Sequence, residues 1–298
     1  MRRHATILGM KTLREYITDA KNGGTAIGHF NISTLDALHA IFQAAQKRNV
    51  PVIIGVSEGE RDFVGVHEAA ALVRSLREQY DYPIFLNADH TYSFERCKEA
   101  IDAGYDAVIF DGAKLSFSEN VATTAKVVQY ARACGRDVLV EAELGYIGTS
   151  SKVLDALPEG AALSPEVLTS VEDALKFVEE TGVDLFAPAI GSVHGMLRVG
   201  NDPDLDIERI RAIADAVKIP LVLHGGSGLT DKTVQEGIAA GISVFHVNTE
   251  LRVAWRDAIK AVLAAEPDEV APYKILKSAV AGVERVVEKK LALCNPNN

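Results

Sequence analysis

The sequence predicts an α/β protein, a single (β/α)8 TIM barrel domain over residues 1–298 with an additional C-terminal helix. Short β-branched runs alternate with amphipathic stretches, a pattern typical of parallel strands joined by crossover helices. Eight such units follow one another without a Pro/Gly/Ser-rich linker or a repeat. A barrel of this kind uses about 250 residues as one domain, which suits a chain of 298 residues.

The alternative architecture is an open, doubly wound sheet. A dinucleotide-binding sheet would need a Gly-x-Gly-x-x-Gly turn after its first strand. Here the first strand runs Ile27-Gly28-His29-Phe30-Asn31 instead, so the barrel is favoured.

Eight apolar runs are the expected strands. In chain order they are Ala26 to Phe30, Pro51 to Val56, Pro83 to Asn87, Ala107 to Phe110, Val138 to Val140, Leu185 to Ile190, Pro220 to Leu223 and Ser243 to Val247.

Apolar residues at helical spacing lie between these strands. Two examples are Leu35, Leu38, Phe42, Ala45 and Leu168, Val171, Leu175, Val178. In the second stretch Ser164 is the expected N-cap, with Pro165 at the first helical position and Gly182 at the C-terminal end.

Two segments go beyond the eight units. A further helix is expected over Pro272 to Leu293. The stretch from Gly145 to Leu163 is long for a routine strand-to-helix connection, and a loop of this length on a catalytic face can act as a lid.

The composition is that of an ordinary globular protein. Hydrophobic residues make up 48% and charged residues 24%, and the net charge of −10 disfavours nucleic acid as a partner. Cys97, Cys134 and Cys294 are too few and too far apart for a disulfide framework, which fits a reducing cytosol. The apolar stretch Ala5 to Met10 is too short for a signal peptide or membrane span. We therefore expect a cytoplasmic protein without a membrane partner.

Three histidines end three different strands. Because active sites of such barrels lie at the C-terminal ends of the strands, His90, His194 and His224 can converge as a three-nitrogen metal site with open positions. Zinc suits imidazole best, and Co²⁺ or Fe²⁺ also fits. Asp111 and Glu143 can orient the imidazoles, although a salt bridge at the barrel rim is an equally good interpretation of either carboxylate alone.

Glycine-rich turns after the sixth and seventh strands indicate a phosphate site. Gly195 follows one strand, and the run Gly225-Gly226-Ser227-Gly228 follows the next. Glycine lets a phosphate approach backbone N–H groups, and Asn248-Thr249 at a helix start adds further donors. Tight turns would also use glycine, but this run is longer than a turn needs.

These motifs together resemble the class II, metal-dependent ketose-bisphosphate aldolases, the family of fructose-bisphosphate and tagatose-bisphosphate aldolases. The resemblance covers nearly the whole chain. Its most specific segments are Leu86-Asn87-Ala88-Asp89-His90, Phe110-Asp111-Gly112, Glu141-Ala142-Glu143-Leu144-Gly145, Ala189-Ile190-Gly191 through His194-Gly195, and Leu223-His224-Gly225-Gly226-Ser227-Gly228.

The resemblance implies a role for each matching residue. It implies that His90, His194 and His224 hold the catalytic zinc and that Asp89 is the acid/base at the aldehyde-derived oxygen. It further implies that the phosphate of dihydroxyacetone phosphate is held by Gly195, Gly225, Ser227 and Thr249, near a monovalent cation, and that Ser57 lies near the substrate. A homodimer or homotetramer is implied as well.

The sequence departs from the family pattern in three places. On the last strand the family asparagine that contacts the enediolate is replaced by His246. The loop that begins at Gly145 has no carboxylate at the place of the family's proton-moving acid, and Asp155 and Glu159 lie further on. Tyr273 stands where an arginine is common. His246, as enediolate contact or proton carrier, is therefore a second candidate catalytic residue, and it can equally be a packed strand residue.

The favoured function is reversible, zinc-dependent cleavage of fructose 1,6-bisphosphate to dihydroxyacetone phosphate and glyceraldehyde 3-phosphate. A metal at the two oxygens next to the lost proton would stabilise the negative charge where it develops, so no Schiff-base lysine is needed. The alternatives are an aldolase for another phosphorylated sugar, such as tagatose 1,6-bisphosphate, and a catalytically impaired sugar-phosphate-binding homologue.

Overall fold

The computed structural model describes residues 10–148, 151–157, 167–200 and 202–296. Eight parallel strands close into a barrel in the order β1-β10-β9-β7-β5-β4-β3-β2, which confirms the predicted fold class. The strands are β1 (Ile27–Asn31), β2 (Val52–Val56), β3 (Ile84–Thr91), β4 (Ala107–Phe110), β5 (Leu139–Leu144), β7 (Leu185–Pro188), β9 (Leu221–Leu223) and β10 (Ile242–Val247). β6 (Val153–Leu154) and β8 (Met196–Leu197) pair with each other outside the barrel.

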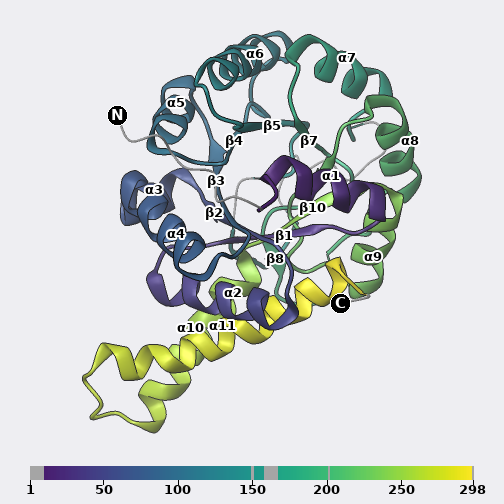
Figure 1. Cartoon of the computed structure of the whole chain (residues 1–298). Helices are drawn as coiled ribbons and strands as arrows, with labels where there is room; N and C mark the ends of the chain where they lie inside the picture. Colours follow the sequence, from purple (N-terminus) through teal and green to yellow (C-terminus); the bar gives the residue numbers. More distant parts are fainter. Residues whose placement is uncertain (1–9, 149–150, 158–166, 201, 297–298) are drawn as a thin grey trace.

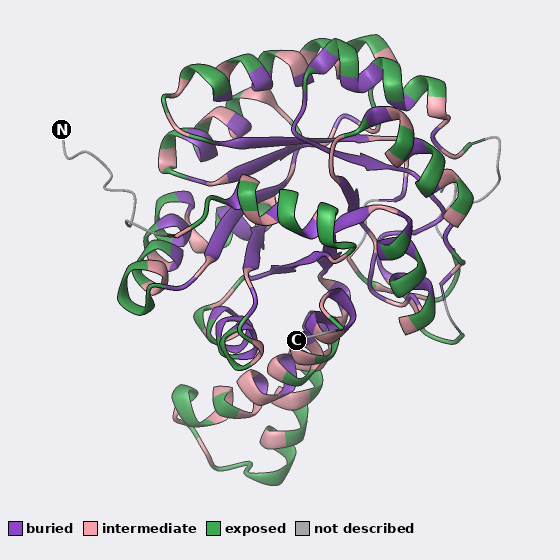
Figure 2. Cartoon of the chain, turned by 45° about the vertical axis from the view of Figure 1, so that its right-hand side comes forward, coloured by how far each residue is buried: buried purple, intermediate pink, exposed green. Residues whose placement is uncertain are grey.

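Helices surround the barrel and cover one of its ends (Figure 1). They are α1 (Leu13–Gly23), α2 (Leu35–Arg48), α3 (Glu58–Val64), α4 (Val66–Tyr80), α5 (Phe94–Ala103), α6 (Phe117–Ala133), α7 (Val171–Thr181), α8 (Ile207–Val217), α9 (Asp231–Ala240), α10 (Thr249–Ala265) and α11 (Pro272–Cys294). Figure 2 shows buried strands inside and exposed outer faces on the helices, the expected layering of an α/β barrel.

The barrel interior is divided into an apolar end and a polar end. At the N-terminal ends of the strands, side chains such as Ile27, Phe85 and Val244 pack in one cluster with Leu13 and Ile17 of α1. The amphipathic helix α1 therefore closes this end. The polar side chains described below lie at the opposite end, which follows from the strand-end positions of those residues.

The predicted helix that ends at Gly182 begins later than expected. Its N-cap is Ser170, whose hydroxyl accepts a hydrogen bond from the backbone N–H of Asp173, and Leu168 precedes the helix. The prediction that this helix includes Leu168 was wrong, because a second serine supplies the cap nearer the apolar repeat. Ser164 and Pro165 lie outside the described residues. Gly182 ends α7 with φ 68°, as predicted.

Strand β3 is longer than predicted and irregular at its end. It continues from Asn87 to Thr91, and its register against β4 shifts between Ala88 and Thr91. His90 has φ 30°, a left-handed conformation that is uncommon for a residue with a side chain. The strand end is thus bent where the candidate site residues occur.

Helices α10 and α11 form an antiparallel pair that extends beyond the barrel (Figure 1). Pro272 is at the start of α11, as predicted, and the helix returns to the barrel, where the Cys294 carbonyl accepts from the backbone N–H of Ala26. Val270 and Tyr273 near the far end are 85% and 68% exposed. Among the described helices, none has the length and apolar character to cross a membrane.

Candidate active site

A pocket opens at the C-terminal end of the barrel strands and gathers most of the predicted site residues. Its wall includes Asn31, Asp89, His90, Ser151, His194, Gly195, His224, Gly225, Gly226, Ser227, His246, Asn248 and Thr249. Residues from β1, β3 and β10 and from the loops after β7 and β9 therefore meet at one place, as the rule for barrel enzymes predicts.

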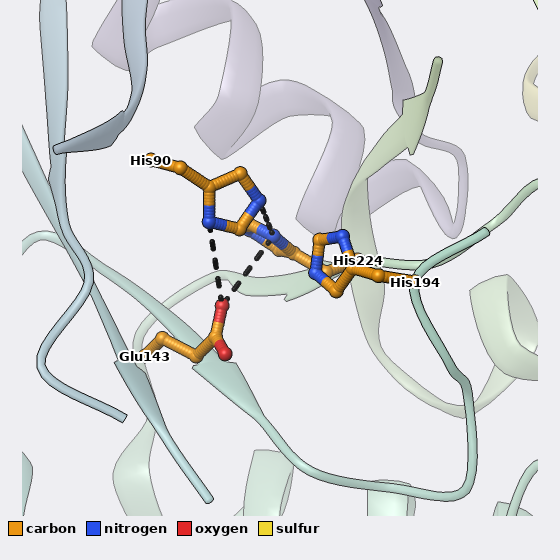
Figure 3. A group of neighbouring side chains, drawn as sticks. All are labelled: His90, Glu143, His194 and His224. Atoms are coloured by element: carbon orange, nitrogen blue, oxygen red, sulfur yellow. Dashed lines mark hydrogen bonds and ion pairs between the residues drawn. The ribbon is translucent and has the colours of Figure 1, made fainter. Parts of the chain in front are cut away.

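The three predicted metal ligands lie together with Glu143. One ligand atom from each of His90, His194, His224 and Glu143 falls within 4.8 Å of the others (Figure 3). His224 Nδ1 is 3.3 Å from His90 Nε2 and 3.6 Å from Glu143 Oε2. The buried atoms His194 Nε2 and Glu143 Oε2 have no hydrogen-bond partner among the described residues. A set of imidazoles with a carboxylate oxygen that makes no hydrogen bond fits a zinc ion.

The outer nitrogens of two of these histidines face carboxylates. His90 Nδ1 is 2.9 Å from Asp111 Oδ2, and His224 Nε2 is 2.6 Å from Glu141 Oε1. Metal-binding histidines usually donate their second N–H to a carboxylate in this way. Asp111 therefore lies where the sequence places it. For His224 the partner is Glu141, which the sequence interpretation missed, while Glu143 faces the cluster itself. The sequence could have indicated Glu141, because residues two positions apart on a strand, such as Glu141 and Glu143, point to the same face.

The electrostatic environment of the cluster favours a cation. Burial lowers the pKa of His90, but the negative charges of Asp89 and Asp111 outweigh this effect and raise the pKa to about 10. Burial, with Asp111 as neighbour, raises the pKa of Glu143 well above its usual value. Burial also lowers the pKa of His194 well below 6.5, which keeps this imidazole neutral, the form that binds metal.

Asp89 lines the pocket, and only one of its two carboxylate oxygens accepts a hydrogen bond from a described residue. Asn31 Nδ2 donates to Asp89 Oδ2 at 2.8 Å, whereas Asp89 Oδ1 has no hydrogen-bond partner among the described residues. Burial would raise the pKa of Asp89, but the charge of His90 holds it well below 3.8. His246 Nδ1 is 3.6 Å from Asp89 Oδ1, so these two candidate residues face each other.

The glycine-rich turns form a cradle of backbone beside the histidines. Gly225 has φ 65°, and a Cβ there would lie 2.4 Å from the Val193 carbonyl oxygen. A Cβ at Gly226 would lie 2.1 Å from the Phe245 ring. Only glycine fits both positions. Ser227 and Thr249 line the same pocket, and Thr249 begins α10 after the N-cap Asn248. A phosphate is well matched to such a helix start.

Ser57 is not among the residues that line the pocket. It caps α3, and its Oγ donates to Glu60 Oε2 at 2.9 Å. Glu60 Oε2 also accepts from Asn31 Nδ2 at 2.8 Å, so Ser57 connects to the pocket wall through Glu60. The sequence interpretation included neither Glu60 nor Asn31.

The buried Arg61 fixes the bent end of β3 and was also missed. Its guanidinium donates to the carbonyl of Asp89 at 3.1 Å and to Thr91 Oγ1 at 3.0 Å, on either side of His90. A helical arginine gives no sequence signal for such a contact.

The first part of the proposed lid is attached beside His194. The backbone N–H of His194 donates to the Ile147 carbonyl at 2.8 Å, and β6 of this loop pairs with β8. Asp155 makes an ion pair with Arg198 at 2.6 Å. Glu159 and Leu163 lie outside the described residues.

Comparisons with known proteins agree with this geometry. The family described as "Fructose-bisphosphate aldolase class-II" matches residues 11–298. The chain is 38% identical over 283 residues to a "Probable fructose-bisphosphate aldolase" of Bacillus subtilis and, with the same identity, to a "Fructose-bisphosphate aldolase" of Staphylococcus aureus, covering 94% of this chain and 95% of each relative. The crystal structure of the YdjI aldolase from Escherichia coli K12 superposes with a TM-score of 0.80 at 28% identity, covering 95% of this chain and 96% of that one.

Proposed function

Because the chain belongs to the class II fructose-bisphosphate aldolase family, we propose that it reversibly cleaves fructose 1,6-bisphosphate to dihydroxyacetone phosphate and glyceraldehyde 3-phosphate. Membership of this family indicates that the protein is an aldolase, an enzyme of the lyase class. One observation carries the choice of substrate class: a histidine cluster and a glycine-rich backbone cradle share one pocket. The first suits a metal next to a carbonyl, and the second suits a phosphate.

We propose Zn²⁺ as the metal, with His90, His194 and His224 as its ligands, and Co²⁺ or Fe²⁺ as substitutes. A bound ion polarises the substrate carbonyl and stabilises negative charge that develops beside it. Asp111 and Glu141 orient His90 and His224 through their outer nitrogens.

In the proposed cleavage step Asp89 takes the proton of the substrate hydroxyl. Asn31 donates to Oδ2, which leaves Oδ1, an atom without a hydrogen bond among the described residues, to accept the proton. Gly195, Gly225, Ser227, Asn248 and Thr249 hold the phosphate of dihydroxyacetone phosphate, and a monovalent cation can lie beside it. Ser57 supports this wall through Glu60.

His246 favours a second candidate substrate. It lines the pocket, and the resemblance puts it at the place of the family asparagine that contacts the reacting fragment, so we propose that it makes this contact here. An imidazole has a different shape and donor set from an amide, which suits an aldolase for another phosphorylated ketose, such as tagatose 1,6-bisphosphate. Turnover of a panel of ketose phosphates separates the two substrates.

We also propose that the enzyme works in carbohydrate metabolism in the cytoplasm as a homodimer or homotetramer. The three cysteines are free thiols, which fits a reducing compartment. Sedimentation of the purified protein measures the number of subunits.

The test of the function is removal of the metal. Chelation should abolish cleavage, and added zinc or cobalt should restore it, because the proposed mechanism has no other electrophile. Borohydride trapping with substrate should label no lysine. Full activity in a protein that contains no metal by elemental analysis would exclude the proposed mechanism.

A further inference from the structure

One lysine of the C-terminal helix α11 is buried, although lysine is normally exposed. Lys290 is 2% exposed, whereas the side chain of its neighbour Lys289 is 61% exposed. Lys290 Nζ forms an ion pair with Glu250 Oε1 at 2.7 Å, and Glu250 lies in the first turn of α10. A buried charge is costly unless it is paired, so the position of the Lys290 side chain depends on this carboxylate.

Glu250 also holds the glycine-rich turn after β9. The same oxygen, Oε1, accepts a hydrogen bond from the backbone N–H of Gly228 at 3.1 Å. The backbone N–H of Glu250 in turn donates to Ser227 Oγ at 3.3 Å. Glu250 therefore contacts two successive residues of the turn, and Lys290 connects the end of α11 to that turn through Glu250.

Lys290 lies against a second support of the same turn. Its Nζ is 6.0 Å from the centroid of the Phe245 ring, a distance at which a cation is attracted to an aromatic face. A Cβ at Gly226 would lie 2.1 Å from this ring, so the ring and the turn are closely packed. Lys290 thus contacts both the carboxylate that holds Gly228 and the ring beside Gly226.

The other side of Gly228 is held by Asp202. The Gly228 carbonyl accepts from the backbone N–H of Asp202 at 3.3 Å. Gly228 has φ 96°, and a Cβ there would lie 2.4 Å from Asp202 Oδ2. Asp202 Oδ1 accepts from the backbone N–H of Leu197 in β8 at 2.9 Å. The backbone of the turn is therefore fixed from two sides, by Asp202 and by Glu250.

We propose that Lys290 is a positioning residue for the substrate phosphate. It holds Glu250 against Gly228, and this contact keeps the N–H groups and the Ser227 hydroxyl of the turn in place. Donors that are fixed beforehand bind an anion more tightly, because binding does not have to order them. Neither Lys290 nor Glu250 is among the residues that line the pocket, so both act through the turn. The proposal rests on the proposed function, in which Gly225 and Ser227 hold this phosphate.

The experiment compares Lys290→Met with Lys289→Met in the zinc-loaded full chain. Both substitutions remove one positive charge, but Lys289 is exposed and pairs with Asp231 on α9. In Lys290→Met, KM for the ketose bisphosphate and the inhibition constant of inorganic phosphate should each rise about tenfold, the effect of losing one hydrogen bond to a charged group. The relative change in kcat should be smaller. Both constants should stay unchanged in Lys289→Met. A loss of folded protein alone would lower the amount of active enzyme and leave both constants unaltered.

A second substitution tests whether Lys290 acts through Glu250. Glu250→Gln keeps the size of the side chain and should raise the same two constants. Adding Lys290→Met to Glu250→Gln should cause no further rise, because the contact is already lost. Lys290→Arg, which keeps the charge, should retain most of the affinity. If Lys290→Met does not fold, Glu250→Gln and the double variant, which leaves no unpaired charge, carry the measurement.

Three results would overturn the proposal. Unchanged constants in Lys290→Met and Glu250→Gln would make this pair a structural link between α10 and α11. Rises that add in the double variant would mean that Lys290 acts without Glu250. An equal rise in Lys289→Met would assign the effect to net charge. If the chain cleaves no ketose phosphate, the proposed function fails, and calorimetric binding of inorganic phosphate to the same variants still decides the role of Lys290.

Discussion

Asp89 and His90 are neighbours in the sequence, yet both side chains reach the same pocket. Successive residues of a regular strand point to opposite faces, so a regular β3 would turn one of them away. The left-handed conformation of His90 and the register shift before Thr91 remove this alternation. Arg61 holds both sides of the bend. Strain of this kind at a site residue is typical of functional positions.

The role of Asp89 can be tested by substitution. Asp89→Ala should lower kcat by roughly 10²- to 10⁴-fold, the usual effect of losing an acid/base, because Oδ1 is the proposed proton acceptor. Metal content should be unchanged in limiting zinc, since His90, His194 and His224 remain. A variant that loses its metal and regains full turnover when zinc is added would show that Asp89 is structural.

His246 calls for a measurement that separates chemistry from packing. If it contacts the reacting fragment, His246→Ala should slow proton exchange at C3 of dihydroxyacetone phosphate as much as it slows cleavage. Both rates are normalised to folded protein, because the side chain is buried. Unchanged exchange together with lower stability would make His246 a packed strand residue, and His246→Asn would then have little effect.

At the scale of elements, the sequence predicted all eight barrel strands because apolar runs mark buried parallel strands clearly. It also predicted that His90, His194 and His224 meet, since strand ends of a barrel share one face. It missed the extension of β3, which depends on Arg61 from another element. It missed the facing of His29 and His246, because side-chain proximity across a barrel depends on register, which periodicity alone does not fix.

The turn after β9 provides a prediction at this scale. Gly225→Ala should raise KM for the phosphorylated substrate or prevent correct folding of the turn, because a Cβ there would meet the Val193 backbone. Gly135→Ala is the control, since Gly135 also has a positive φ but a Cβ there would meet no atom of the described residues within 4 Å. Equal effects of the two substitutions would mean that backbone strain alone is responsible. KM and thermal melting measured on both variants decide the question.

For the whole molecule, the buried imidazoles predict how the stability of the metal-free protein depends on pH. Burial lowers the pKa of His29 from 6.5 to about 4. The unfolded chain therefore binds this proton first as the pH falls, so the stabilisation is present above pH 6.5 and is lost towards pH 4.

This loss can be measured by denaturant unfolding. Between pH 7.5 and 5, metal-free protein should lose about 2 kcal/mol more than His29→Gln does. His39→Gln, which alters an exposed ring, should follow the unmodified chain. Parallel stability curves for the unmodified chain and His29→Gln would contradict the assignment of this proton to His29.

The helix α1 closes one end of the barrel, and this limits where small molecules can enter and leave. Among the described residues the barrel is closed at this end, so substrate, products and metal ions are expected to enter and leave at the C-terminal ends of the strands. Bound substrate therefore covers the way out for a metal ion held by His90, His194 and His224, so a chelator should remove zinc more slowly when substrate is present.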